Sequence, residues 1–121
     1  MRILAVDDNI TSLRYIKSIL DEVDKTVTVP SGERALDFVK KELPKLVVMD
    51  VLMPESDGFA TMEKIRNMEG CKNVPVIFLS GDDDDEIRSK CADMKNASFL
   101  LKPVTEDALI SEVNRVLKLQ Y

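Results

Sequence analysis

The sequence predicts an α/β fold: a five-stranded parallel sheet, doubly wound as (βα)5, with strand order 2-1-3-4-5. Short apolar runs alternate with segments of helical periodicity five times along the 121 residues. Strands that alternate with helices in this way form a parallel sheet covered on both faces. No linker, repeat or low-complexity segment interrupts the alternation, so residues 1–121 are predicted to form one domain.

The first half of the chain supplies three strands and two helices. The predicted strands, which are short apolar or β-branched runs, are Ile3–Val6, Val27–Val29 and Leu46–Met49. The predicted helices are Asn9–Val23 and a segment whose apolar face carries Leu36, Val39 and Leu43, stopped by Pro44.

The second half supplies two strands and three helices. The predicted strands are Val74–Leu79 and Ser98–Leu101. The three helices are indicated by apolar residues at helical spacing: Phe59, Met62 and Ile65, then Ile87, Cys91 and Met94, and finally Leu109, Val113, Val116 and Leu117 in a helix that begins near Thr105. The acidic run Asp82–Asp85 suits the start of the fourth helix, where carboxylates cap free amides.

Composition excludes several function classes. The formal net charge of −5 argues against nucleic-acid binding, which requires a basic surface. Because the chain has no histidine, catalytic triads and most zinc sites are excluded. Cys71 and Cys91 fit no metal or redox motif and are expected to be reduced thiols. The apolar run at the N-terminus is too short for a signal peptide or a membrane span, which predicts a cytoplasmic chain.

Polar residues stand at the carboxyl ends of four predicted strands. Asp7 and Asp8 follow the first strand, Asp50 the third, Ser80 the fourth and Lys102 the fifth. Ligands of open α/β sheets bind at this edge, where the strand order reverses. With the order 2-1-3-4-5, the first and third strands flank that point, so the three carboxylates are expected to cluster there.

Such a cluster needs a counter-charge, because neighbouring carboxylates raise one another's pKa. Mg²⁺ takes oxygen ligands and commonly sits beside a transferring phosphate. Lys102 can supply a positive charge for phosphate oxygens, and Ser80 can supply a hydroxyl donor. A carboxylate nucleophile with these groups suits phosphoryl transfer, in which positioning and charge neutralisation provide most of the rate.

Four motifs, in order and at strand ends, resemble the signature of bacterial two-component response-regulator receiver domains of the chemotaxis-regulator type. They are Val6-Asp7-Asp8-Asn9, Met49-Asp50-Val51-Leu52-Met53-Pro54 with Asp57-Gly58, Leu79-Ser80-Gly81, and Phe99-Leu100-Leu101-Lys102-Pro103. The resemblance covers essentially the whole chain and implies a flavodoxin-like fold.

The resemblance implies a role for each strand-end residue. It makes Asp50 the phosphoacceptor, Asp8 a direct Mg²⁺ ligand and Asp7 a ligand acting mostly through water. The backbone carbonyl of Leu52 is implied as a further ligand, and Ser80 and Lys102 would hold the phosphoryl oxygens. The Lys102–Pro103 bond is expected to be cis.

The resemblance also implies a switch and partners. Ser80 would move toward the phosphoryl group, and Phe99 would turn inward into the vacated space, which changes the surface of the fourth helix, fifth strand and fifth helix. The implied phosphodonor is a histidine kinase or phosphotransfer protein, and the implied receiver of the signal is an output domain or protein bound at that surface. Neither nucleic acid nor a membrane is expected as a direct partner.

The main alternative is a degenerate receiver, a protein-interaction module that never takes phosphate. The complete set of strand-end residues counts against it. A phosphohydrolase of the haloacid-dehalogenase class would need a second aspartate where Leu52 stands, and a flavodoxin would need a phosphate-cradling loop after the first strand. The chain is therefore predicted to catalyse only its own phosphorylation and dephosphorylation, and not to be a general enzyme.

Overall fold

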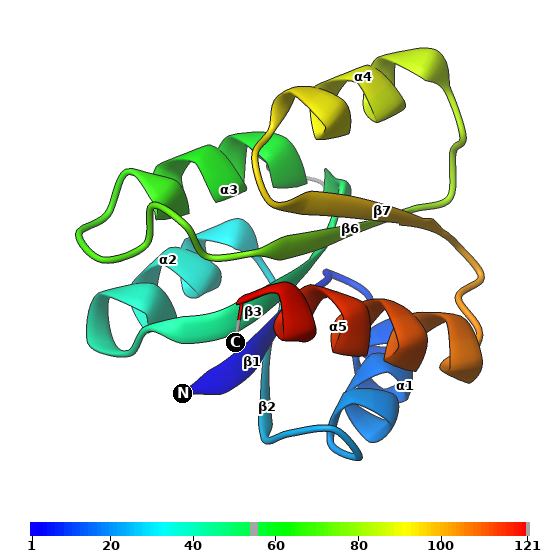
Figure 1. Ribbon diagram of the computed structural model, residues 1–121, viewed down its shortest axis with the longest axis horizontal. Coiled ribbons are helices and arrows are strands. Elements are labelled where there is room, and N and C mark those ends of the chain that lie inside the picture. The colour runs from blue at the N-terminus through cyan, green and yellow to red at the C-terminus, as the bar shows by residue number, and fades with distance from the viewer. Residues whose placement is uncertain (54–55, 121) are drawn as a thin grey trace.

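The chain folds into three layers, with a central sheet between two groups of helices (Figure 1). The computed structural model describes residues 1–53 and 56–120. The five strands of the sheet are β1 (Arg2–Val6), β2 (Thr26–Val29), β3 (Pro44–Asp50), β6 (Val76–Ser80) and β7 (Ala97–Leu101). All neighbouring strands are parallel and their order is β2-β1-β3-β6-β7. Counted along the sheet strands alone, this is the predicted order 2-1-3-4-5, so the predicted fold class is confirmed.

In the described part of the chain, four helices connect the strands and a fifth follows β7. They are α1 (Ile10–Leu20), α2 (Gly32–Lys41), α3 (Gly58–Arg66), α4 (Asp85–Asp93) and α5 (Glu106–Gln120). The first four begin at side chains that accept a hydrogen bond from the amide three residues later, which satisfies an otherwise free donor. These capping residues are Asn9, Ser31, Asp57 and Asp84. The acidic run before α4 therefore caps a helix, as the sequence predicts.

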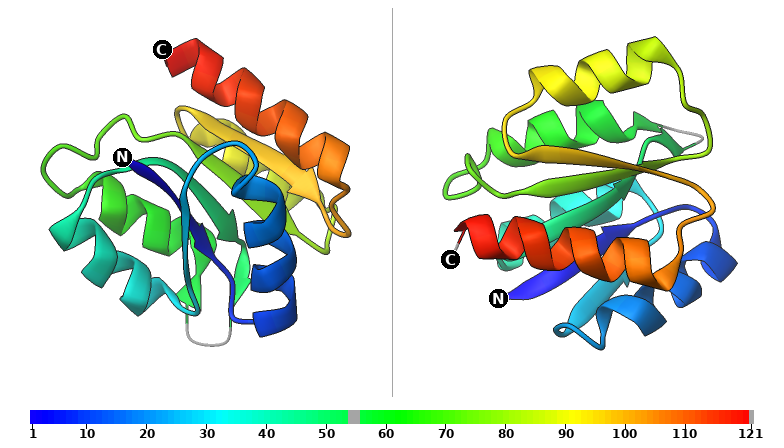
Figure 2. Two further views of the ribbon diagram at one scale, coloured as in Figure 1. Left: turned by 90° about the horizontal axis from the view of Figure 1, so that it is seen from below. Right: turned by 45° about the vertical axis from the view of Figure 1, so that its right-hand side comes forward.

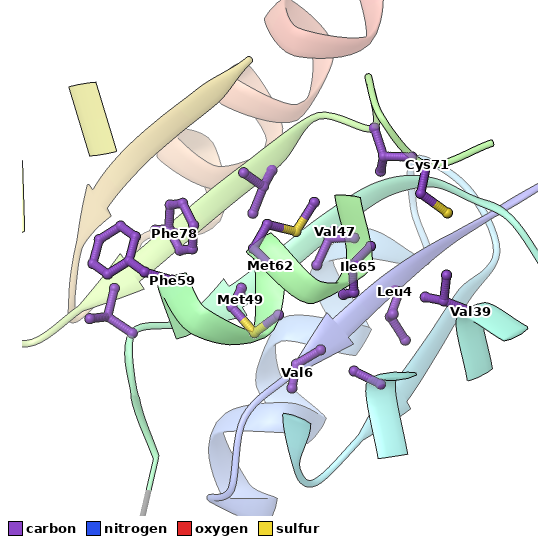
Figure 3. Packing of buried hydrophobic residues seen from close by; sticks show 14 of the residues in the cluster. Leu4, Val6, Val39, Val47, Met49, Phe59, Met62, Ile65, Cys71 and Phe78 are labelled. Carbon is purple, nitrogen blue, oxygen red and sulfur yellow. The ribbon is translucent and has the colours of Figure 1, made fainter. Parts of the chain in front are cut away.

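The helices divide between the two faces of the sheet (Figure 2). On one face α1 and α5 cover a cluster that includes Ile3, Ala5 and Val113. On the other face α2, α3 and α4 cover a second cluster (Figure 3). There the rings of Phe59 and Phe78 lie 4.4 Å apart, centroid to centroid. Because successive strand residues point to opposite faces, one apolar strand contributes to both clusters.

Polar contacts join the strands at the amino edge of the sheet, the edge where the strands begin. Ion pairs connect the segments that start β1, β2 and β3, and the guanidinium of Arg66 donates to two carbonyl oxygens that precede β6 and β7. These contacts are Arg2–Glu42, Lys45–Asp24, Arg66–Val74 O and Arg66–Asn96 O. Side chains thereby join the beginnings of β1, β2 and β3, and Arg66 separately joins the segments that precede β6 and β7.

Three predicted boundaries are wrong. Helix α1 ends at Leu20 rather than Val23, although Val23 still packs against the core. Helix α2 ends at Lys41, and Leu43 lies outside it with 41% of its surface exposed. Pro44 begins β3 instead of only stopping a helix, because the first position of a strand tolerates the missing amide.

The sequence also did not predict a short antiparallel hairpin of β4 (Leu52–Met53) and β5 (Ser56–Asp57). The Lys102–Pro103 bond is cis, as expected. Asn96, which precedes β7, has a φ of 54°, a conformation that asparagine tolerates better than most residues. Among the described residues, no helix is long and apolar enough to cross a membrane.

Candidate functional site

The three predicted carboxylates meet at the carboxyl edge of the sheet. Strands β1 and β3 are neighbours, with Val6 paired to Met49, so the residues that follow these two positions lie side by side. Carboxylate oxygens of Asp7, Asp8 and Asp50 lie within 4.8 Å of one another. Asp7 and Asp50 are buried, whereas Asp8 is exposed. The apolar sheet thus holds two of the acids away from water and leaves the third at the surface.

Lys102 reaches this cluster from the edge strand β7. Its Nζ lies 2.9 Å from Asp7 Oδ2 and 3.3 Å from Asp50 Oδ1. Its backbone amide donates to Ser80 O at 2.7 Å, which continues the pairing of β6 with β7 past the end of β7. The structure therefore brings together the lysine and two of the acids, as the sequence predicts.

The two buried acids have pKa values displaced in opposite directions. Burial raises the pKa of Asp50 to about 6, with repulsion from Asp7 adding to the effect and Lys102 opposing it. Burial also acts to raise the pKa of Asp7, but the Asn9 amide and Lys102 outweigh it, so this pKa is lowered. Although burial acts to lower the pKa of Lys102, its two carboxylate partners raise it. Asp50 is therefore the acid whose charge is least compensated, and a bound cation would relieve it.

Ser80, at the end of β6, is buried beside this edge. Its hydroxyl donates to Asp82 O and accepts from Asp82 N, both at 3.0 Å. Phe99 lies on the neighbouring strand, half-buried, with the guanidinium carbon of Arg88 5.0 Å from its ring centroid. Arg88 is also ion-paired with Asp83. The predicted switch residues thus stand on adjacent strands, and the segment that follows Ser80 reaches the Phe99 ring through Asp83 and Arg88.

The loop after Asp50 approaches the site closely. Leu52 has 57% of its surface exposed, and its carbonyl as a metal ligand stays a prediction. Pro54, which the sequence places in the same motif, lies outside the described residues. A Cβ at Gly58 would lie 2.4 Å from Asp50 O, so this position excludes any larger residue without movement. At Gly81 a Cβ would meet nothing within 4 Å, so the backbone here is open on that side.

Sequence reasoning missed three contacts that α1 and α4 make with the site. The Ser12 hydroxyl helps to lower the pKa of Asp7, Tyr15 Oη donates to Val104 O at 2.8 Å, and the Arg88 guanidinium lies over the Phe99 ring. Ser12 and Tyr15 are three residues apart, which places them on one face of the helix. That spacing was visible in the sequence, but only the folded chain shows what the face meets.

The donor set fits a hard divalent cation. Two buried carboxylates and one exposed carboxylate converge, and oxygen is the ligand atom that Mg²⁺ prefers. The raised pKa of Asp50 means that burial disfavours its ionised form, and a bound cation would stabilise that form. The same carboxylate, with Lys102 beside it, has the groups that phosphoryl transfer to an aspartate requires.

Comparison with known proteins places the chain in a family. The family model described as response regulator receiver domain matches residues 3–114. Two-component response regulator ORR5 of Oryza sativa subsp. japonica is 31% identical over 96% of this chain and 88% of its own length. The sensor histidine kinase TmoS of Ectopseudomonas mendocina is 26% identical over 98% of this chain, which spans 12% of that kinase.

Among solved structures, the chemotaxis protein CheY4 of Vibrio cholerae superposes with a TM-score of 0.89 and 25% identity, over 95% of this chain and 97% of that one. The family match covers nearly the whole chain, and the fold and the cluster of acids agree with it. The chain belongs to the response regulator receiver domain family of two-component signal transduction.

Proposed function

We propose that this receiver domain takes a phosphoryl group onto Asp50 from a phosphohistidine of a histidine kinase or phosphotransfer protein. The observation that supports this most is the position of Asp50: buried, at the end of a central strand, 3.3 Å from Lys102 Nζ and beside two further acids. An aspartate with only a structural role would not need a lysine and two acids around it.

In the transfer, an Asp50 carboxylate oxygen attacks phosphorus, the bond from phosphorus to the imidazole nitrogen breaks, and the imidazole leaves with that electron pair and takes up a proton. The product is an acyl phosphate. Lys102 neutralises charge on the phosphoryl oxygens, and the Ser80 hydroxyl donates to one of them. Beyond this reaction and the hydrolysis of the acyl phosphate by water, which releases inorganic phosphate, the domain is a signalling module and not a general enzyme.

Asp7, Asp8, Asp50 and the carbonyl of Leu52 would hold Mg²⁺. When bound, the ion supplies positive charge against the phosphoryl oxygens as negative charge develops there. The residues fit this ion because they offer oxygen atoms only, and because the raised pKa of Asp50 reflects charge that no side chain fully compensates.

The signal would leave through the face formed by α4, β7 and α5. When Ser80 turns to a phosphoryl oxygen it gives up two hydrogen bonds to the backbone of Asp82. The segment before α4 is then free to shift, and Phe99 can move into the vacated space. An output domain or protein would read this change; direct contact with nucleic acid or a membrane forms no part of the proposal.

We place the domain, residues 1–121, in the cytoplasm, where a kinase's phosphohistidine is available. Cys71 and Cys91 are buried free thiols, as a reducing compartment favours. A degenerate receiver that never takes phosphate is the rival function. The intact set of acids, serine and lysine weighs against it, because an interaction module would have no use for a buried carboxylate with a raised pKa.

The test is phosphorylation in vitro. Incubated with Mg²⁺ and acetyl phosphate, the protein should gain one acid-labile phosphoryl group, detected by intact mass, and Asp50→Asn should gain none. Asp37→Asn, an exposed aspartate on α2, is the matched control and should behave as wild type. A wild type that never gains a phosphoryl group would overturn the proposal and favour the degenerate receiver. A phosphoryl group that persists on Asp50→Asn would overturn the assignment of Asp50 as the acceptor.

A further inference from the structure

Helix α1 contacts the carboxyl edge of the sheet at two successive turns. At the start of the helix, the Asn9 amide donates to Asp7 Oδ1 at 3.0 Å, and the Ser12 hydroxyl helps to lower the pKa of this carboxylate. One turn later, Tyr15 Oη donates to Val104 O at 2.8 Å. The same helix therefore holds Asp7 directly and holds the segment that carries its ion-pair partner, Lys102.

The segment from Lys102 to Val104 is fixed at both ends. At its start the Lys102 amide donates to Ser80 O at 2.7 Å. At its end the Val104 side chain is buried in the core beneath α1 and α5, and its carbonyl accepts from Tyr15. Lys102 Nζ must reach two carboxylates from this segment, so the position of the segment sets the position of the ammonium group.

Val104 packs into the core, but the segment as a whole is not packed closely against α1. A pocket of about 340 Å³ that is open to solvent lies between them, lined mainly by apolar surface, with Ser12, Tyr15, Ile16, Leu79, Lys102, Pro103 and Val104 around it. Side chains that line such a pocket make fewer packing contacts on that side. The hydrogen bond from Tyr15 to Val104 O is a directional contact that crosses this pocket from the helix to the lysine-bearing segment.

We propose that Tyr15 is a positioning residue for phosphoryl transfer, acting through Lys102. Its hydroxyl holds the Lys102–Val104 segment so that Nζ stays where the phosphoryl oxygens arrive. This inference rests on the proposed function, because it assigns the residue a part in the transfer to Asp50. Catalytic groups displaced by a fraction of an ångström lose much of their effect.

The test removes only the hydroxyl. Tyr15→Phe should slow phosphorylation by acetyl phosphate at saturating Mg²⁺ by about threefold to tenfold, the range that one net hydrogen bond provides. Ser18→Ala is the matched control, since it removes a hydroxyl from the exposed side of α1 that bonds only within the helix. Its rate should equal that of wild type.

Two measurements separate positioning from a general structural effect. In a Lys102→Ala background, Tyr15→Phe should cause no further loss, because the residue acts through that lysine. By hydrogen exchange, the Lys102 amide should exchange faster in Tyr15→Phe than in wild type or Ser18→Ala, while the amides of β1 stay unchanged.

The outcomes are distinct. If wild type is phosphorylated but Tyr15→Phe matches it, or slows equally with and without Lys102, the positioning role is wrong and the proposed function stands. Unchanged exchange at Lys102 also overturns the role. A wild type that is never phosphorylated overturns the proposed function, and the positioning role with it.

Discussion

Replacing Asp50 by asparagine should make the metal-free protein more stable near neutral pH. The pKa of Asp50 is raised to about 6 in the folded chain, from an ordinary value of 3.8. Between these two values the folded state binds the proton more tightly than the unfolded state does, so the free energy of unfolding falls as pH rises. Asparagine has a similar shape and no charge, so this loss should disappear.

The magnitude follows from the displacement of the pKa. A rise from 3.8 to about 6 is close to two units, and each unit corresponds to about 1.4 kcal/mol, so the gain at about pH 7 should be roughly 3 kcal/mol. Because the raised pKa already includes the attraction of Lys102, no separate correction for the lost ion pair is needed. Near pH 4, where Asp50 is protonated in the folded state, the gain should be close to zero.

Urea denaturation followed by circular dichroism, in a chelator at several pH values, measures this difference. Asp37→Asn removes an exposed carboxylate of α2 and should give no comparable gain. An excess of Mg²⁺ should narrow the gap, because the wild type would bind the ion more tightly. An Asp50→Asn protein that is no more stable than wild type near pH 7, or whose advantage persists unchanged at acid pH, would refute this account of the site.

Three further predictions test neighbouring contacts. Gly58→Ala should lower the free energy of unfolding by about 1–3 kcal/mol in urea denaturation, since its Cβ meets a backbone oxygen at 2.4 Å, whereas Gly81→Ala, with open space around it, should change little. Thermal melts should rise with millimolar Mg²⁺ in wild type, and Asp8→Asn should lose most of that rise. Arg88→Ala should raise the affinity for beryllofluoride, used in place of the phosphoryl group, by about twofold to fivefold in titrations. The reason is that the Arg88 cation over the half-exposed Phe99 ring stabilises the present position of the ring by about 0.5–1 kcal/mol.

The sequence predicts the strands and the edge where the chemistry lies because both depend on simple regularities, whereas the strand order 2-1-3-4-5 is implied by the family resemblance. Apolar runs of the right length mark buried strands, and a parallel sheet collects its strand ends at one edge. For that reason Asp7, Asp50 and Lys102, distant in sequence, were expected together and are found together.

The remaining features depend on tertiary contacts that periodicity does not report. Leu43 has the spacing of a helical core residue, yet α2 ends before it, where the chain must turn to begin β3. The hairpin at Leu52–Met53 is too short to have a pattern. From the sequence alone, Tyr15 is expected to be an exposed aromatic residue on a helix. Its hydrogen bond to Val104 joins residues that are 89 positions apart. The roles of Leu52 and Phe99 stay predictions.

The side-chain contacts at the amino edge of the sheet have a consequence for how substitutions elsewhere affect stability. Arg2–Glu42, Lys45–Asp24 and the bonds of Arg66 join the strands where no proposed chemistry occurs. At the opposite edge, Asp50 carries a charge that weakens the fold. Since distant sites contribute to stability almost independently, substitutions in the loops at the carboxyl edge should leave the contribution of the amino edge to stability unchanged.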